Sequence, residues 1–168
     1  MFEYDPYLGW RFIPNKRGAI VYQGVSPRFI KNNSLGFRDK ELPSDNEYIS
    51  KMLVLEDSFV SNISVKDDEV FTEIIERQLY NTRVMNFGVN RYGQVQEYLL
   101  LKQWLGKINP ELVILVICIW NDFEENIRES WNYPRPLASW DQEDSTLRIN
   151  SPRPPRPEDS TSISYWCF

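Results

Sequence analysis

The segment KMLVLEDS, from Lys51 to Ser58, decides the fold of this chain. Lys51–Leu55 is a short apolar run that is typical of a buried strand, and two acidic residues then lead to the serine. A side chain at this position emerges at the carboxyl end of the strand, where open α/β sheets place their binding and catalytic groups. Ser58 is therefore a candidate nucleophile, although the chain has no histidine to activate it.

The residues after this segment alternate between helix and strand patterns. Apolar residues at helical spacing predict helices from Val70 to Leu79 and from Val95 to Leu105, with Gly106 as the cap of the second helix. Thr82–Phe87 and Leu112–Ile119 are predicted to be strands. This β-α-β-α-β order predicts a three-layer, flavodoxin-like, doubly wound α/β domain that is incomplete, with about three parallel strands.

The remaining parts of the chain show no such alternation. Residues 1–50 are rich in aromatic residues and turn formers, which predicts an irregular, β-rich N-terminal extension of short strands and loops. Residues 51–131 form the predicted α/β core. Residues 132–168 are expected to be an irregular, proline-rich segment with one short strand at Thr146–Ile149.

Composition limits the classes of function. The formal net charge of −5 argues against a nucleic-acid-binding surface, which would be basic. Cys118 and Cys167 are not spaced as metal ligands, so in a chain without histidine we expect neither a metal site nor a cofactor. The start of the chain does not resemble a signal peptide, and the apolar run from Leu112 to Trp120 is too short to span a membrane. The chain as written is therefore expected to be cytoplasmic.

Three segments are expected to converge at one edge of the sheet, because the carboxyl ends of parallel strands point the same way. They are Asp57-Ser58, Asn86–Arg91 and Trp120–Asp122. Together they offer a hydroxyl group, a loop of backbone N–H groups and an asparagine amide. Acyl transfer needs this combination, since hydrogen-bond donors stabilise the charge that develops on the attacked carbonyl oxygen.

These segments resemble the sequence blocks of the SGNH (GDSL-type) hydrolases, a superfamily of serine esterases, lipases, thioesterases and carbohydrate deacetylases. The first block, normally Gly-Asp-Ser, is similar to Glu56-Asp57-Ser58. The second is similar to NFGVNRYG, which starts at Asn86, and the third, usually Gly-Asn-Asp, is similar to Trp120-Asn121-Asp122. The upstream segments DPYLGW, from Asp5, and NSLGFRD, from Asn33, resemble the leader of one bacterial subgroup.

The resemblance implies a role for each residue of the site. Ser58 would be the nucleophile and Asn121 a side-chain donor to the oxyanion. Backbone N–H groups of Ser58 and of the loop that contains Gly88 and Arg91 would complete the oxyanion hole. Three residues would support the site: Asp57, Asp122 and Glu56. The implied substrate is a small-molecule ester or an acylated carbohydrate.

The chain departs from the family pattern in ways that bear on activity. Glu56, Arg91 and Trp120 replace the glycines of the three blocks, and Arg91 lacks the conformational freedom of glycine. The Asp-x-x-His block near the family's C-terminus is absent. Loss of the triad costs a serine hydrolase about 10⁶-fold in rate. We therefore expect a C-terminally truncated and degenerate hydrolase with impaired or no activity.

Two questions stay open: the role of Glu56 and the function of the whole chain. Either Glu56 replaces the histidine as base, which requires a raised pKa, or Glu56 forms a salt bridge with Arg91 across a degenerate site. Either the whole chain is a weakened ester hydrolase, or it is a non-catalytic binding module on the same scaffold. A nucleotide-binding function is disfavoured, because no glycine-rich phosphate loop follows the first strand of the core.

The predicted Leu112–Ile119 strand also has a structural consequence. The family's sheet would place a strand on each side of it, and this chain lacks the segment for one of them. An apolar strand at a sheet edge favours pairing with another chain. We therefore expect self-association through this edge, aggregation, or cover by the segment after residue 140.

Overall fold

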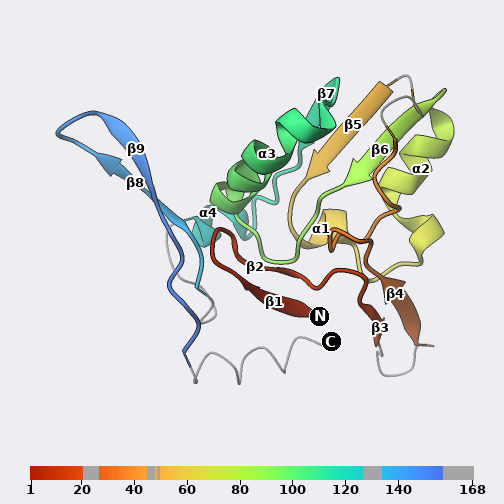
Figure 1. Cartoon of the computed structure of the whole chain (residues 1–168), viewed down its shortest axis with the longest axis horizontal. Coiled ribbons are helices and arrows are strands. Elements are labelled where there is room, and N and C mark those ends of the chain that lie inside the picture. The colour runs from red at the N-terminus through yellow and green to blue at the C-terminus, as the bar shows by residue number, and fades with distance from the viewer. Residues whose placement is uncertain (21–26, 45–47, 49, 127–133, 157–168) are drawn as a thin grey trace.

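The centre of the protein is a three-stranded parallel sheet with the order β6-β5-β7 (Figure 1). The computed structural model describes residues 1–20, 27–44, 48, 50–126 and 134–156. The parallel strands are β5 (Ser50–Leu55), β6 (Thr82–Asn86) and β7 (Leu112–Leu115). The α/β class and the three parallel strands predicted from the sequence are confirmed.

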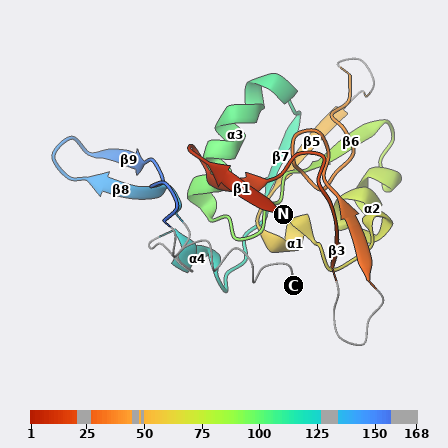
Figure 2. The same ribbon diagram turned by 60° about the horizontal axis from the view of Figure 1, so that its bottom comes forward.

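The sheet is packed on both faces, because the consecutive residues 52–55 of β5 are all apolar and their side chains point to opposite faces in turn. The helices of the chain are α1 (Ser58–Ser61), the 3₁₀ helix η1 (Asp67–Glu69), α2 (Phe71–Gln78), α3 (Gln94–Ile108) and α4 (Asp122–Glu125). Leu53 and Leu55 belong to a buried cluster that includes Leu99 of α3. Val54 belongs to the cluster on the other face, against which Phe71 of α2 packs. Figure 2 shows the sheet between α3 and α2.

Two predicted boundaries are corrected. Gly106 lies inside α3 and does not cap it; the capping residue is Asn109, which has a left-handed φ of 49° and donates its N–H to the carbonyl oxygen of Leu105. β7 ends at Leu115 and not at Ile119. The reason is the length of its neighbour, since Leu115 lies opposite the last residue of β5.

The N-terminal extension shares the main hydrophobic core. Four strands form two antiparallel pairs there: β1 (Phe2–Asp5) with β2 (Gly9–Phe12), and β3 (Arg17–Ile20) with β4 (Arg28–Lys31). The phenol of Tyr92 donates to the carbonyl oxygen of Trp10 at 2.6 Å, and Phe37 stacks on Phe87 with 3.9 Å between ring centroids. The predicted short strands are thus confirmed, and their aromatic residues cover the loop after β6.

The C-terminal part contains one strand more than predicted. β8 (Leu137–Asp141) pairs with β9 (Thr146–Asn150) in an antiparallel hairpin that extends away from the parallel sheet (Figure 1). β9 confirms the strand predicted at Thr146–Ile149, whereas β8 corrects the expectation of an otherwise irregular segment. The predicted boundary between residues 131 and 132, and the chain from Pro157 onward, lie outside the described residues.

A buried ion-pair network joins the N-terminal extension to β6. The side chain of Arg83 is 1% exposed, and its guanidinium lies 2.7 Å from a carboxylate oxygen of Asp39 and 2.7 Å from one of Glu76. The same carboxylates accept backbone hydrogen bonds from β6: Asp39 from Asn86 at 2.9 Å and Glu76 from Val84 at 2.8 Å. The two acidic residues therefore close the outer edge of this strand.

We predict that Asp39→Ala lowers the free energy of unfolding by about 3 kcal/mol, because it leaves the buried charge of Arg83 and the N–H of Asn86 without this partner. Urea unfolding of the full chain measures the change. Asp68→Ala, at an exposed position of the 3₁₀ helix η1, is the matched control and should stay within about 0.5 kcal/mol of the unmodified protein. An Asp39→Ala variant as stable as the control would contradict the structural role of the network.

Candidate functional site

Ser58 lies where the sequence predicted it, just beyond the carboxyl end of β5 and at the first position of α1. Its side chain is half-buried. The hydroxyl donates a hydrogen bond to Oδ1 of Asp57 at 3.3 Å. The acceptor that the structure provides for a proton from Ser58 is thus a neighbouring carboxylate.

The first and third predicted segments meet at Asp57. Its second carboxylate oxygen accepts a hydrogen bond from the Asn121 amide at 2.9 Å, across 64 positions of the sequence. Asn121 is also tied to α4 through the backbone, because the N–H of Glu125 donates to the carbonyl oxygen of Asn121 at 3.0 Å. The amide predicted to stabilise an oxyanion is therefore held by the carboxylate of Asp57. Asp122 has the predicted supporting role, because it accepts the backbone N–H of Cys118 at 2.7 Å.

The second segment packs against α1 through Gly88. A Cβ atom at this position would lie 2.2 Å from the backbone nitrogen of Ser61, so only glycine fits. The N–H of Gly88 donates to the side-chain oxygen of Asn86 at 3.0 Å. The glycine therefore has a steric role here, and its N–H is directed into its own loop.

Arg91 keeps the backbone conformation that favours glycine. Its φ is 68°, in the left-handed region, which costs a residue with a side chain on the order of 1–2 kcal/mol. Its carbonyl oxygen accepts a hydrogen bond from Arg135 at 3.2 Å. Arg91 thus adopts a backbone conformation that glycine would adopt at a lower energetic cost.

Five carboxyl groups are buried around the site, none of them more than 6% exposed: Glu56, Asp57, Glu97, Asp122 and Glu125. Both carboxyl oxygens of Glu97 lack a hydrogen-bond partner among the described residues, as does one oxygen of Asp122. Glu97 and Glu125 were missed in the sequence, because nothing local distinguishes them from the solvated acidic residues of an amphipathic helix. The described residues contain no group of acidic or sulfur side chains placed to hold a metal ion.

Burial raises the pKa of these carboxyl groups. The pKa of Glu97 rises to about 8 because the group is buried and because Asp122, Asp57 and Glu125 carry like charges. Burial also raises the pKa of Glu125 to about 7, although the positive charge of Arg135 opposes the shift. The site is therefore partly protonated near neutral pH.

Glu56 has the raised pKa that the role of base requires, but it does not bond to Ser58. Its carboxylate accepts the backbone N–H of Val60 at 2.8 Å, while Ser58 bonds to Asp57. Burial raises the pKa of Glu56, and the charges that act on it come from Asp57 and Asp122. Among the described residues, Glu56 therefore forms no ion pair with Arg91. The side chain of Glu56 instead holds the first turn of α1.

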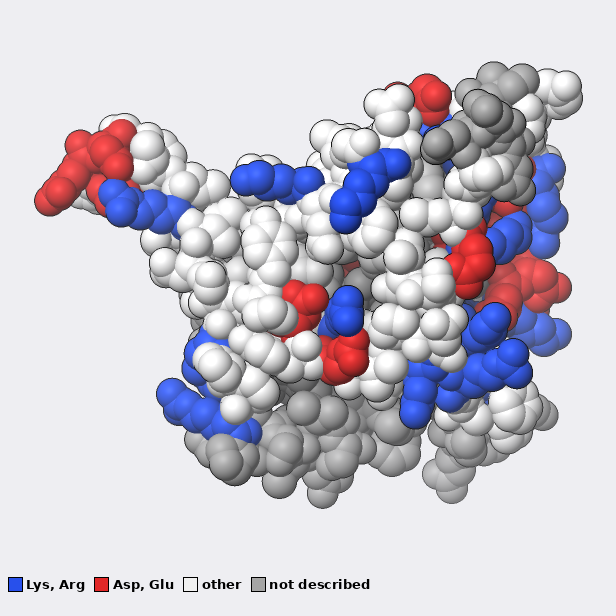
Figure 3. Space-filling model, viewed as in Figure 1, with Lys and Arg blue, Asp and Glu red and all other residues white. Residues whose placement is uncertain are grey.

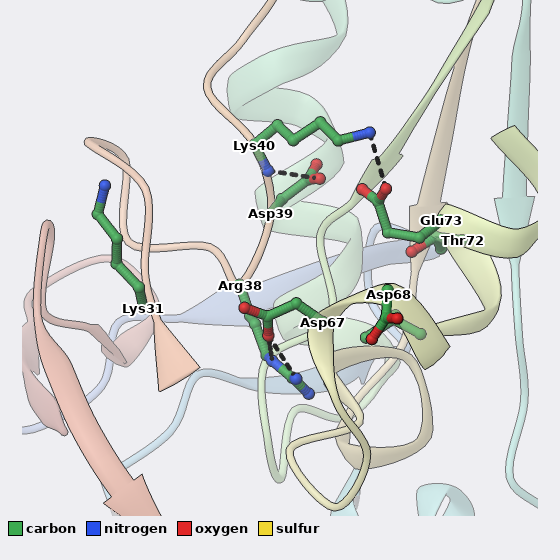
Figure 4. A pocket seen from close by; sticks show the side chains of 9 residues that line it. Lys31, Arg38, Asp39, Lys40, Asp67, Asp68, Thr72 and Glu73 are labelled. Atoms are coloured by element: carbon green, nitrogen blue, oxygen red, sulfur yellow. Dashed lines mark hydrogen bonds and ion pairs between the residues drawn. The ribbon is translucent and has the colours of Figure 1, made fainter. Parts of the chain in front are cut away.

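A pocket of about 350 Å³ lies elsewhere, between the segment around Arg38 and the start of α2 (Figure 4). Two of its cations point toward its own carboxylates, whereas the amine of Lys31 points away from them (Figure 4). The guanidinium of Arg38 lies 2.6 Å from Asp67, and the amine of Lys40 lies 2.7 Å from Glu73. The charges of Arg38 and Lys40 are thus neutralised by carboxylates of the pocket itself.

The charged surface is mixed. On the face seen in Figure 3, acidic and basic side chains lie side by side, and acidic residues gather at the tip of the β8–β9 hairpin. Arg148 pairs there with Asp141 and Asp144, each at 2.8 Å. Basic side chains gather at the lower right of this face, with acidic ones beside them. No helix in the described part of the chain is long and apolar enough to cross a membrane.

We predict that the protein loses stability as the pH rises from 6 to 9. Glu97 and Glu125 bind protons in the folded state at pH values where the unfolded chain, with a pKa of 4.5, has released them. The loss should be roughly 2–3 kcal/mol for Glu97 alone. Glu97→Gln should remove that part of the slope and match the unmodified protein at pH 5, whereas Glu143→Gln, in the exposed hairpin, should keep it. Urea unfolding across this range measures the slope, and a flat or rising profile would refute the assignment.

No family model matches the chain, and no curated protein shows significant sequence similarity to it.

Proposed function

We propose that the chain has the doubly wound, flavodoxin-like fold of the SGNH hydrolases. In this proposal it carries the part of a serine ester hydrolase active site that contains the nucleophile, Ser58. The observation that carries the proposal is the carboxylate of Asp57, which joins the serine of the first block to Asn121 of the third. The packing of α2 and α3 on opposite faces of the sheet supports the proposed fold. The substrate class that we propose is a small acyl or acetyl ester, including an acylated carbohydrate.

The proposed activity is residual. With no histidine in the chain, the hydroxyl of Ser58 has only the Asp57 carboxylate as its hydrogen-bond acceptor among the contacts described. A serine hydrolase without its triad retains roughly 10³–10⁴-fold of catalysis over water, which comes from its oxyanion hole and binding contacts. Because Asn121 and the N–H of Gly88 are engaged within the protein, the rate should lie at or below the lower end of this range.

The second candidate is a non-catalytic binding module on the same scaffold. This candidate is favoured because the hydrogen-bond donors of the site, the Asn121 amide and the N–H of Gly88, already bond to groups of the protein. A site whose amide is already held by a carboxylate is not preorganised for the charge of a tetrahedral intermediate. Such a site would bind the acylated ligand and leave its ester bond intact.

A fluorophosphonate probe separates the two candidates. We predict slow covalent labelling of the unmodified protein, lost in Ser58→Ala and retained in Ser64→Ala, an exposed serine in the turn after α1. Labelling is followed by intact-protein mass spectrometry, and circular dichroism confirms that each variant is folded. If the folded protein is labelled no faster than Ser58→Ala, the hydrolase proposal fails and the binding module is favoured.

A further inference from the structure

The two edges of the parallel sheet differ in how they are closed. At the outer side of β6, the backbone N–H groups of Val84 and Asn86 donate to the carboxylates of Glu76 and Asp39. That edge therefore offers these donors to no other strand. Natural proteins protect sheet edges in this way against pairing with further chains.

The edge at β7 is open. The N–H of Val116 donates to the carbonyl oxygen of Leu55, and since backbone groups alternate between the two sides of a strand, those of Val113 and Leu115 point away from β5. Within the described ranges, no hydrogen bond closes these outward groups. The hairpin strands β8 and β9 pair with each other and not with β7.

Apolar side chains continue along this open edge and beyond it. Five of them are between 44% and 90% exposed: Leu112, Leu115, Ile117, Ile119 and Trp120. Together they expose on the order of 600 Å² of apolar surface, so two such surfaces would bury about 1,200 Å², which reaches the size of a specific protein interface. The surface is thus large enough to support a stable dimer.

The sequence of the edge suits pairing with itself. From Leu112 to Trp120 it contains no charged residue and no proline, the residues that usually prevent edge pairing. In an antiparallel pair centred near Ile114, Glu111 of one copy would lie opposite Ile117 of the other. The carboxylates of the two copies would not meet, although the chain carries a net charge of −5.

We infer that a second copy of this chain docks along β7, in antiparallel orientation about a two-fold axis. The paired strands join two three-stranded sheets into one sheet of six strands. Each copy satisfies the outward backbone groups of Val113 and Leu115 in its partner, and the apolar side chains beyond β7 pack across the axis. The same surface is used by both copies, which closes the assembly at two.

Sedimentation equilibrium of the full chain tests the inference. We expect a reversible dimer in the micromolar range, weakened at least about ten-fold by Leu115→Lys and by Ile117→Lys, because each places a charge in the apolar contact. Leu147→Lys is the matched control, since Leu147 is an apolar residue, 60% exposed, on β9. A monomer at all concentrations overturns the inference, and so does a dimer that all three variants leave intact.

Hydrogen exchange on the unmodified protein gives a second measurement that does not depend on the folding of a variant. The amides of Val113 and Leu115 should become protected as the protein concentration rises through the dissociation constant, while the amide of Leu147 should not change. Protection that is independent of concentration would mean that a segment of the same chain covers the edge, which also overturns the inference. Fast exchange of the Val113 and Leu115 amides at every protein concentration would also overturn the inference.

Discussion

The ion pair between Arg83 and Asp39 is the interaction on which the arrangement of the sheet depends. Arg83 lies on β6 and Asp39 in the N-terminal extension, and both side chains are at most 3% exposed. Burial raises the pKa of Asp39 to about 6, against the effect of the adjacent guanidinium, so the pair is maintained at a cost in desolvation. The hydrogen bonds that the N–H groups of β6 donate to Asp39 and Glu76 offset this cost.

Closure of one edge makes the sheet asymmetric, and the candidate site lies toward the open side. Asn121 follows β7, the edge strand, and reaches back to Asp57 after the central strand β5. The position of Asn121 therefore depends on a strand held by a single neighbour. A partner that pairs with β7 would restrain this strand and, through it, the third segment of the proposed site.

Local patterns in the sequence predicted most of the core, because the features they report are local. A continuous apolar run predicted β5, helical spacing predicted α2 and α3, and the parallel order of the strands placed Ser58 and Asn121 at one edge of the sheet. The errors come from partners distant in the sequence. The length of β7 depends on where β5 ends, the burial of Glu97 depends on the site packed around it, and β8 is a strand only because β9 pairs with it.

The buried carboxyl groups bear on the origin of the site. The sheet and α3 share an apolar cluster that includes Leu55 and Leu99, so the fold does not require acidic groups at this position. Glu97 has no hydrogen-bond partner for either oxygen among the described residues, and an apolar side chain of similar volume would be at least as stable there. A scaffold used only for packing has no reason to hold such groups beside a half-buried serine. Their presence is easier to explain if the edge was built around a reacting or bound polar group, which is the common element of both proposed functions.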